Sequence, residues 1–198
     1  MDLEKRFAQQ LIFFKEIDRL KSVLRKTSLI DKDRVENSAE HSWQVAFMAL
    51  FLQEYAEGNL DICRVMQMLL VHDLVEIDAG DTFIYHEGNQ SEKMEREMKA
   101  AQRIFGLLPE DQSNYLMELW QEFEREDSQE AKFAAALDRL QPVLHNYFNQ
   151  GGNWHDFGIS REQVEKVNQK IENGSPKLWQ QLQIILDEAE VRGYFFSK

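Results

Sequence analysis

The chain has 198 residues, of which 43% are hydrophobic and 29% are charged, a composition typical of one soluble globular domain. Its 35 acidic and 23 basic residues leave a net charge of −12, which argues against general binding to nucleic acid or to anionic membranes. The N-terminus lacks the apolar stretch of a secretory signal, and no stretch approaches the roughly 18 apolar residues that span a bilayer. With one cysteine an intrachain disulfide is excluded, and we expect a cytoplasmic protein.

Apolar residues recur with helical spacing through almost the whole chain. The first helix is expected over 3–25, followed by a polar loop over 27–36. The expected buried stripe of this helix consists of Phe7, Leu11, Phe14, Ile17 (or Asp18), Leu20 and Leu24. An Asn-x-x-Glu capping pattern, Asn37 with Glu40, begins the second helix, because the Asn side chain can accept a free backbone N–H while the Glu reaches back.

A third helix follows Gly58-Asn59 and ends at Gly80, and the loop over 81–89 after it is long for a helical bundle. A fourth helix is expected over 91–105, and Pro109 suits the first turn of a fifth. Three more helices are expected to begin at polar caps, namely Asp127 with Glu130, Ser160 with Gln163, and Ser175 with Pro176.

No strand pattern is longer than a few residues, and the sequence shows no repeat and no linker. Only nine Gly and three Pro disfavour a turn-rich all-β protein. The sequence therefore predicts an all-α fold, a single compact domain over 1–198 of about eight helices. The core that carries the motifs described next covers about 10–150, and C-terminal helices lie within 160–193.

Four ionisable residues lie within apolar stripes, where a bare charge is expensive to bury. His41 lies on the apolar face of the second helix, His72 and Asp73 follow the apolar run 66–71, and Asp138 interrupts a run of alanines and leucine. Taken singly, each is explained by a satisfied core residue, and Asp138 by a pair with an arginine. Together, two imidazoles and two carboxylates from three helices suit a divalent metal with positions left open for water and substrate.

The order His41…His72-Asp73…Asp138, with the segments LKSVLR, RVENSAEHSWQVA and HDLVEIDAGD, resembles the HD-domain metal-dependent phosphohydrolase superfamily. Within it, the resemblance is to the branch of bacterial 5′-deoxynucleotidases and their eukaryotic relatives. It covers about 10–150. It implies one divalent metal held by these four residues, and removal of the 5′-phosphate from nucleoside monophosphates by metal-activated water.

The resemblance also assigns roles to three further residues. Glu76 matches a glutamate that acts as general acid or base, Asp81 matches a second catalytic carboxylate, and Arg25 matches an arginine that contacts the substrate phosphate. A solvated helix end for Glu76 and a simple cap for Asp81 are the structural alternatives. The segment 19–34 carries six basic and two acidic residues, which favours phosphate binding there, and Arg34 is a second candidate contact.

The sequence departs from this branch at Lys26, where the 5′-deoxynucleotidase has a tryptophan linked to sugar discrimination, so the preference between ribose and deoxyribose stays open. One alternative function is hydrolysis of phosphodiesters or pyrophosphates, such as cyclic nucleotides or guanosine polyphosphates. Another is a non-catalytic nucleotide-sensing module that binds a metal.

The metal can be Mn, Co, Zn, Fe or Mg, since two His and two carboxylates suit all of them. We expect a nucleoside monophosphate as the small-molecule partner, a homodimer, and no nucleic-acid or membrane partner. Whether the loop over 81–89 closes over the substrate is open.

Overall fold

The computed structural model describes residues 3–31, 33–85 and 90–196. These residues are mainly helical, with one two-stranded sheet, which confirms the predicted all-α class. In chain order the elements are α1 (Leu3–Ile17), the 3₁₀ helix η1 (Asp18–Ser22), β1 (Leu24–Ser28), β2 (Val35–Asn37), α2 (Ser38–Leu52), η2 (Gln53–Tyr55), α3 (Ile62–Val71), η3 (His72–Val75), α4 (Glu76–Ala79), α5 (Gln90–Phe105), α6 (Glu110–Arg125), α7 (Gln129–Phe148), α8 (Gly152–Asp156), α9 (Arg161–Asn168), α10 (Lys170–Gly174) and α11 (Pro176–Val191).

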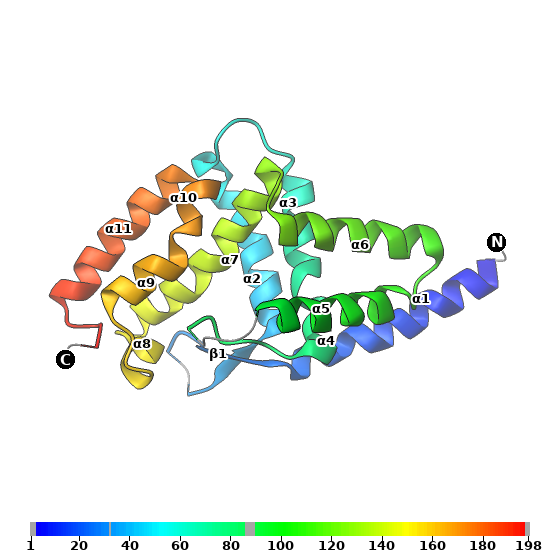
Figure 1. Cartoon of the computed structure of the whole chain (residues 1–198), viewed down its shortest axis with the longest axis horizontal. Coiled ribbons are helices and arrows are strands. Elements are labelled where there is room, and N and C mark those ends of the chain that lie inside the picture. Colours follow the sequence, from blue (N-terminus) through cyan, green and yellow to red (C-terminus); the bar gives the residue numbers. More distant parts are fainter. Residues whose placement is uncertain (1–2, 32, 86–89, 197–198) are drawn as a thin grey trace.

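Helix α7 is the central element of the fold. It contacts α2, α3, α6, α8, α10, α11 and β1, and Figure 1 shows it between the α5–α6 side and the C-terminal helices. Its alanines Ala134 and Ala136 are completely buried, and small side chains there let neighbouring helices approach closely. The closest approach is at Gly174 of α10, where an added Cβ would lie 2.1 Å from the carbonyl oxygen of Lys132. The motif-bearing helices are thus packed around one rigid axis.

The N-terminal helix is shorter than predicted. The expected helix over 3–25 ends at Ile17, passes through η1 and continues as β1, so the predicted burial of Phe7, Leu11, Phe14 and Leu24 is wrong: these side chains are exposed. Phe13 and Leu20 are buried. Figure 1 shows the N-terminal part of α1 extending beyond the other helices, and the change to 3₁₀ geometry and then to β1 moves Leu24 out of the helical stripe.

The segment predicted as a polar loop over 27–36 forms part of a β-hairpin. Strands β1 and β2 pair antiparallel with Leu24 opposite Asn37 and Ser28 opposite Val35. The hairpin contacts α7 through β1, and Asn153 of α8 donates from Nδ2 to the backbone oxygen of Lys26 at 2.7 Å. The basic segment is therefore fixed against the helices.

Several helix boundaries follow the predicted caps. The Asn37–Glu40 and Ser160–Gln163 capping boxes are both present, and Ser175 caps α11 with Pro176 at its start. The predicted cap at Asp127 is wrong, because the Ser128 hydroxyl accepts the Ala131 N–H and begins α7.

The helical segments are shorter and more numerous than the eight expected. The predicted third helix changes from α to 3₁₀ at His72 before Gly80 ends it at a φ of +75°. Residues 86–89 of the long loop lie outside the described residues. Among the described residues, no helix is both long enough and apolar enough to cross a membrane.

Candidate metal centre and adjoining cavity

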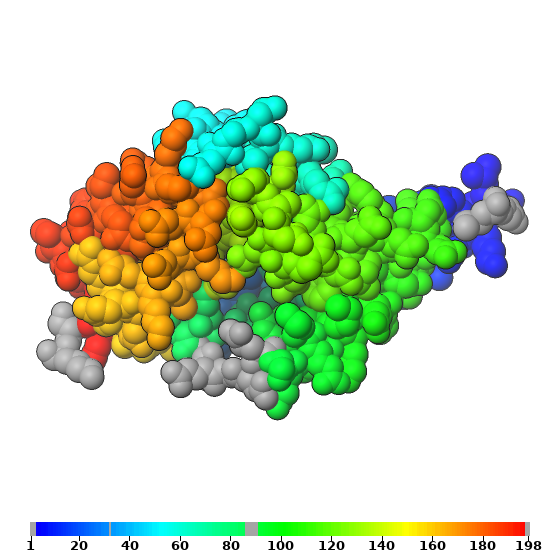
Figure 2. Space-filling model, turned by 45° about the horizontal axis from the view of Figure 1, so that its top comes forward, coloured from blue at the N-terminus to red at the C-terminus, as the bar shows by residue number. Residues whose placement is uncertain are grey.

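A cavity of about 1070 Å³ opens beside α7. Its walls come from β1, η3, the segment after Gly80, α5, α7 and the C-terminal helices. The space-filling view shows the hollow where α5, α7 and the C-terminal helices meet (Figure 2). Its volume lies just above the range that is usual for small-molecule sites, about 300–1,000 Å³.

Three elements bring the four candidate ligands together at one end of this cavity. His41 comes from α2, His72 and Asp73 from η3, and Asp138 from α7. The Nε2 atom of His41 lies 2.9 Å from Asp138 Oδ1, and His72 Nε2 lies 3.1 Å from Asp73 Oδ1 and 3.5 Å from Asp138 Oδ1. One donor atom each from His41, His72 and Asp73 lies within 4.8 Å of the others.

The hydrogen bonding of His72 shows that this group suits a cation. Its Nδ1 lies 2.8 Å from the backbone oxygen of Leu69, which can only accept, so Nδ1 carries the proton. The neutral ring then directs the Nε2 lone pair at two carboxylates, and this buried Nε2 has no hydrogen-bond partner. A proton or a divalent metal resolves that arrangement, and the donor set of two imidazoles and two carboxylates fits the metal.

The charges around the two imidazoles also favour binding of a cation. Burial and the nearby Arg25 oppose protonation of His41, but the hydrogen bond to Asp138 and the nearby carboxylate of Glu36 outweigh them and raise the pKa of His41 to about 9. Burial alone would raise the pKa of Asp138, yet its hydrogen bond with His41 and the nearby His72 hold that pKa well below the ordinary value. The centre therefore attracts positive charge strongly.

Behind His41 lies a buried pair that the sequence analysis missed, Glu36 and Gln141. Both side chains are fully buried, and Gln141 Nε2 donates to Glu36 Oε2 at 2.8 Å. Burial opposes the charge on Glu36, but His41 and Arg25 outweigh burial and hold its pKa below the ordinary value, so this carboxylate only accepts.

This hydrogen bond determines how Gln141 is oriented. Because its nitrogen faces Glu36, its oxygen faces His41 Nδ1, at 3.1 Å. The Nδ1 atom of His41 must therefore carry a proton in the neutral ring, and Nε2 is left with the lone pair facing Asp138. Glu36 thus sets, through Gln141, the tautomer that a metal ligand needs. Gln141 stands three residues after Asp138 on the same helix, and that spacing was a signal in the sequence.

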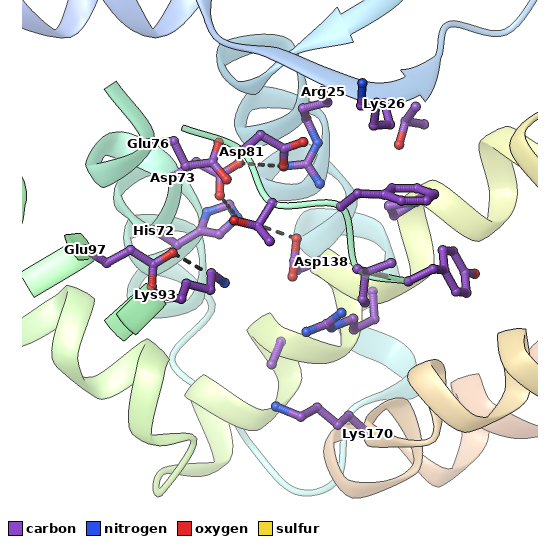
Figure 3. Close-up of a pocket in the computed structure, with 18 of the residues that line it drawn as sticks. Arg25, Lys26, His72, Asp73, Glu76, Asp81, Lys93, Glu97, Asp138 and Lys170 are labelled. Atoms are coloured by element: carbon purple, nitrogen blue, oxygen red, sulfur yellow. Dashed lines mark hydrogen bonds and ion pairs between the residues drawn. The ribbon is translucent and has the colours of Figure 1, made fainter. Parts of the chain in front are cut away.

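The carboxyl of Glu76 lies next to this cluster, on the cavity wall. Ser38 donates from Oγ to Glu76 Oε2 at 2.6 Å. Burial and the negative charge of Asp73 raise the pKa of Glu76 to about 8. Burial also raises the pKa of Asp81, although Arg25 opposes the shift. Figure 3 shows Asp73, Glu76 and Asp81 close together, with the ring of His72 between this group and Asp138.

Arg25 connects the acidic residues. From β1, its Nε lies 3.2 Å from Glu36 Oε1, and its Nη1 lies 3.0 Å from Asp73 Oδ2 and 3.8 Å from Asp81 Oδ1. Arg34, by contrast, is not brought to the cavity. Its guanidinium forms two hydrogen bonds with Glu40 on the exposed start of α2.

Comparison with known proteins identifies the family. The HD-domain family model matches residues 17–179. The chain is 32% identical to a mouse protein named 5′-deoxynucleotidase HDDC2 over 74% of this chain and 75% of that one. It is 31% identical to 5′-deoxynucleotidase ECA3034 of Pectobacterium atrosepticum over 79% and 82%.

Solved structures agree. A crystal structure of a predicted metal-dependent phosphohydrolase from Magnetospirillum magnetotacticum superimposes with a TM-score of 0.92 at 52% identity, covering 97% of this chain and 96% of that one. A protein from Pyrococcus horikoshii, at 22% identity and a TM-score of 0.62, shares the fold. The motifs, the fold and these relatives lead to one conclusion: the chain belongs to the HD-domain family of hydrolases.

Proposed function

We propose that this chain is a metal-dependent phosphohydrolase that removes the 5′-phosphate from nucleoside monophosphates. The observation that carries the proposal is the orphaned Nε2 of His72, directed at two carboxylates in the wall of a cavity of nucleotide size. The names of relatives at 31–32% identity, all 5′-deoxynucleotidases, support this substrate class.

The metal site consists of His41, His72, Asp73 and Asp138. A divalent metal supplies Lewis-acid chemistry in such a site, polarising a phosphoryl oxygen and lowering the pKa of water. Glu76 holds a proton near neutral pH, because its pKa is raised to about 8, and it lies where that proton can pass to the leaving sugar oxygen.

Arg25 and Asp81 complete the site. The contacts of Arg25 with described residues engage Nε and Nη1, which leaves Nη2 to bind a phosphate oxygen. Asp81 faces the same guanidinium and orients it. Arg34 has no assigned role here, since its guanidinium is taken up by Glu40.

Phosphate release tests this function. Metal-stripped protein is assayed with each of Mn, Co, Zn, Fe and Mg on ribo- and deoxyribonucleoside 5′-monophosphates, with cyclic, diester and pyrophosphate substrates alongside. We expect metal-dependent release from monophosphates, and its loss in Asp73→Ala. Release only from diesters or pyrophosphates, or no release from any substrate by the metal-loaded protein, contradicts the proposal. The deoxyribose to ribose ratio reports what Lys26 does.

A homodimer is part of the proposal, and the exposed face of α2 supports it. Trp43, Phe47 and Phe51 follow one another at four-residue spacing and are 63%, 48% and 62% exposed. The rings of Trp43 and Phe47 are stacked, with centroids 5.9 Å apart, and those of Phe47 and Phe51 are tilted, with centroids 5.3 Å apart. A contiguous aromatic surface of this kind is typical of an interface, and a second copy of the same face is its simplest partner.

Light scattering measures the mass of the protein in solution. Phe47→Glu places a charge in the aromatic face and is expected to give a monomer, whereas Ile184→Glu, on the exposed side of α11, leaves the dimer intact. A monomeric wild type contradicts a dimer, and a dimeric Phe47→Glu contradicts this interface. The cytoplasmic location and the single domain over 1–198 stay predictions from the sequence.

A further inference from the structure

The arginines of this chain are almost all ion-paired. Of eleven arginines, nine lie within 4 Å of a carboxylate, as expected in a chain with a net charge of −12. Within the described part of the chain, Arg96 and Arg139 make no ion pair, and both line the cavity. Cations without a partner in the wall of a ligand cavity indicate that the ligand supplies the negative charge.

Arg139 is the better placed of the two. It is half-buried, whereas Arg96 is exposed. The residues of α7 that line the cavity recur at helical spacing: Ala135, Asp138, Arg139, Pro142, Val143 and Asn146. Arg139 therefore lies on the cavity-facing side of this helix.

Asp138 does not neutralise Arg139. The Asp138 carboxylate is hydrogen-bonded to His41 and lies beside His72, on the side of the metal centre. The charge of Arg139 acts instead on the phenol of Tyr85. Burial raises the pKa of Tyr85 to about 12, and the positive charge of Arg139 is among the effects that oppose this rise. Arg139 and Tyr85 thus both line the cavity, close enough for the charge of Arg139 to act on the phenol.

Side-chain hydrogen bonds hold several polar residues of the cavity wall in place. The side-chain amides of Asn146, Asn153 and Asn168 donate to backbone oxygens of Pro142, Lys26 and Val164. Lys166 is exposed at the same wall. Lys170 also lines the cavity, and Figure 3 shows it separated from the carboxylates that surround Arg25. Its amine pairs with Glu126.

We propose that the substrate carries a second phosphate, away from the reacting one, and that Arg139 binds it. This inference rests on the proposed phosphohydrolase function, in which the metal residues and Arg25 already receive the reacting phosphate. A nucleoside 3′,5′-bisphosphate has the required chemistry, since the sugar separates its two phosphates. The cavity of about 1070 Å³ is large enough for a doubly phosphorylated nucleotide.

Steady-state kinetics test the proposal. Phosphate release from adenosine 5′-monophosphate, adenosine 3′,5′-bisphosphate and adenosine 5′-diphosphate is compared in wild type, Arg139→Gln and Arg125→Gln. Arg125 is the matched control, because it is exposed and paired with Asp127 outside the cavity wall. We expect wild type and Arg125→Gln to prefer the 3′,5′-bisphosphate over the monophosphate by about tenfold to a hundredfold in kcat/KM, the range of a charge-assisted hydrogen bond.

In Arg139→Gln this preference is expected to disappear through a higher KM for the bisphosphate. An equal loss on both substrates places Arg139 at the reacting phosphate and overturns the proposal, as does an unchanged preference. A preference for the 5′-diphosphate puts the second charge beside the first and also overturns it.

Binding of adenosine 3′-monophosphate separates this inference from the catalytic one. This compound lacks the 5′-phosphate but keeps the second one, and calorimetry measures its Kd for the metal-loaded protein. Weakening by tenfold or more in Arg139→Gln, and none in Arg125→Gln, supports the anion site even if no substrate is hydrolysed. Equal affinity in all three proteins overturns it while the phosphohydrolase function stands.

Discussion

Glu76 lies in a buried environment that favours the protonated form of its carboxyl. Burial and Asp73 raise its pKa to about 8, so it holds a proton at the pH at which an alkoxide leaving group needs one. We predict that Glu76→Gln, which keeps the shape and removes the transferable proton, lowers kcat by about 10²- to 10⁴-fold while metal binding stays at the wild-type level. Phosphate release and metal content measure the two effects. Glu118→Gln, exposed on α6, is the control. Full turnover in Glu76→Gln contradicts the assigned role.

Gln141 acts through His41 rather than on substrate. It transmits the orientation set by Glu36, so that His41 presents the Nε2 lone pair. We predict that Gln141→Leu, which fills a similar volume without the amide, weakens metal affinity by about 10- to 100-fold, as loss of such outer partners does. Competition with a chelator measures the Kd, and ¹⁵N chemical shifts of His41 report its tautomer. Gln67→Leu, on α3, is the control. Unchanged shifts together with unchanged affinity contradict this role.

The buried pair Glu36 and Gln141 shows which part of the site could not be predicted from the sequence. His41, His72 and Asp138 were found because each places an ionisable group on an apolar helix face. Glu36 was missed because it stands in a segment that looks like a polar loop and becomes fully buried only when the hairpin packs. The contact between Glu36 and Gln141 joins residues 105 positions apart, and local spacing holds no information about it.

At the scale of elements, the hairpin β1–β2 positions Arg25 and leads directly into α2. The Asn37–Glu40 capping box fixes this junction, since Asn37 accepts the Glu40 N–H while Glu40 accepts the Asn37 N–H. We predict that Asn37→Ala lowers the free energy of unfolding by about 1 kcal/mol, which corresponds to roughly 2–4 °C in Tm for a chain of this size. Thermal unfolding measures it, with Asn59→Ala in an exposed loop as the control. Equal Tm values for both variants contradict a stabilising cap.

The start of a helix was predicted correctly where one side chain caps it. Side-chain caps such as Asn37 and Ser175 satisfy free backbone groups locally, so the sequence alone reveals them. The hairpin was not predicted, because β1 reads LRKTS and β2 has three residues, too short to show alternation. Its pairing is stabilised by contacts with α7 and α8 instead.

At the scale of the whole molecule, protonation of the metal centre is coupled to stability. In metal-free protein the pKa of His41 is about 9 and that of Glu76 about 8, both above their ordinary values of 6.5 and 4.5. Between pH 6.5 and 8 the folded protein therefore binds more protons than the unfolded chain. Stability falls with rising pH wherever that is so. Asp138 and Glu36, whose pKa values are lowered, are ionised in both states over this range and add no slope.

We predict that the Tm of chelator-treated protein falls by several °C between pH 6.5 and 8.5, since 1 kcal/mol corresponds to roughly 2–4 °C. Saturating divalent metal is expected to raise the Tm, because it binds only the folded protein. It is also expected to reduce the fall with pH, because the metal binds the imidazole lone pairs in place of protons and binds more tightly as the protons are lost. Scanning calorimetry at matched ionic strength measures both curves. In Glu76→Gln the metal-free slope is expected to be shallower, since one of the groups with a raised pKa is gone. A metal-free Tm that is constant or rises over this pH range contradicts the coupling.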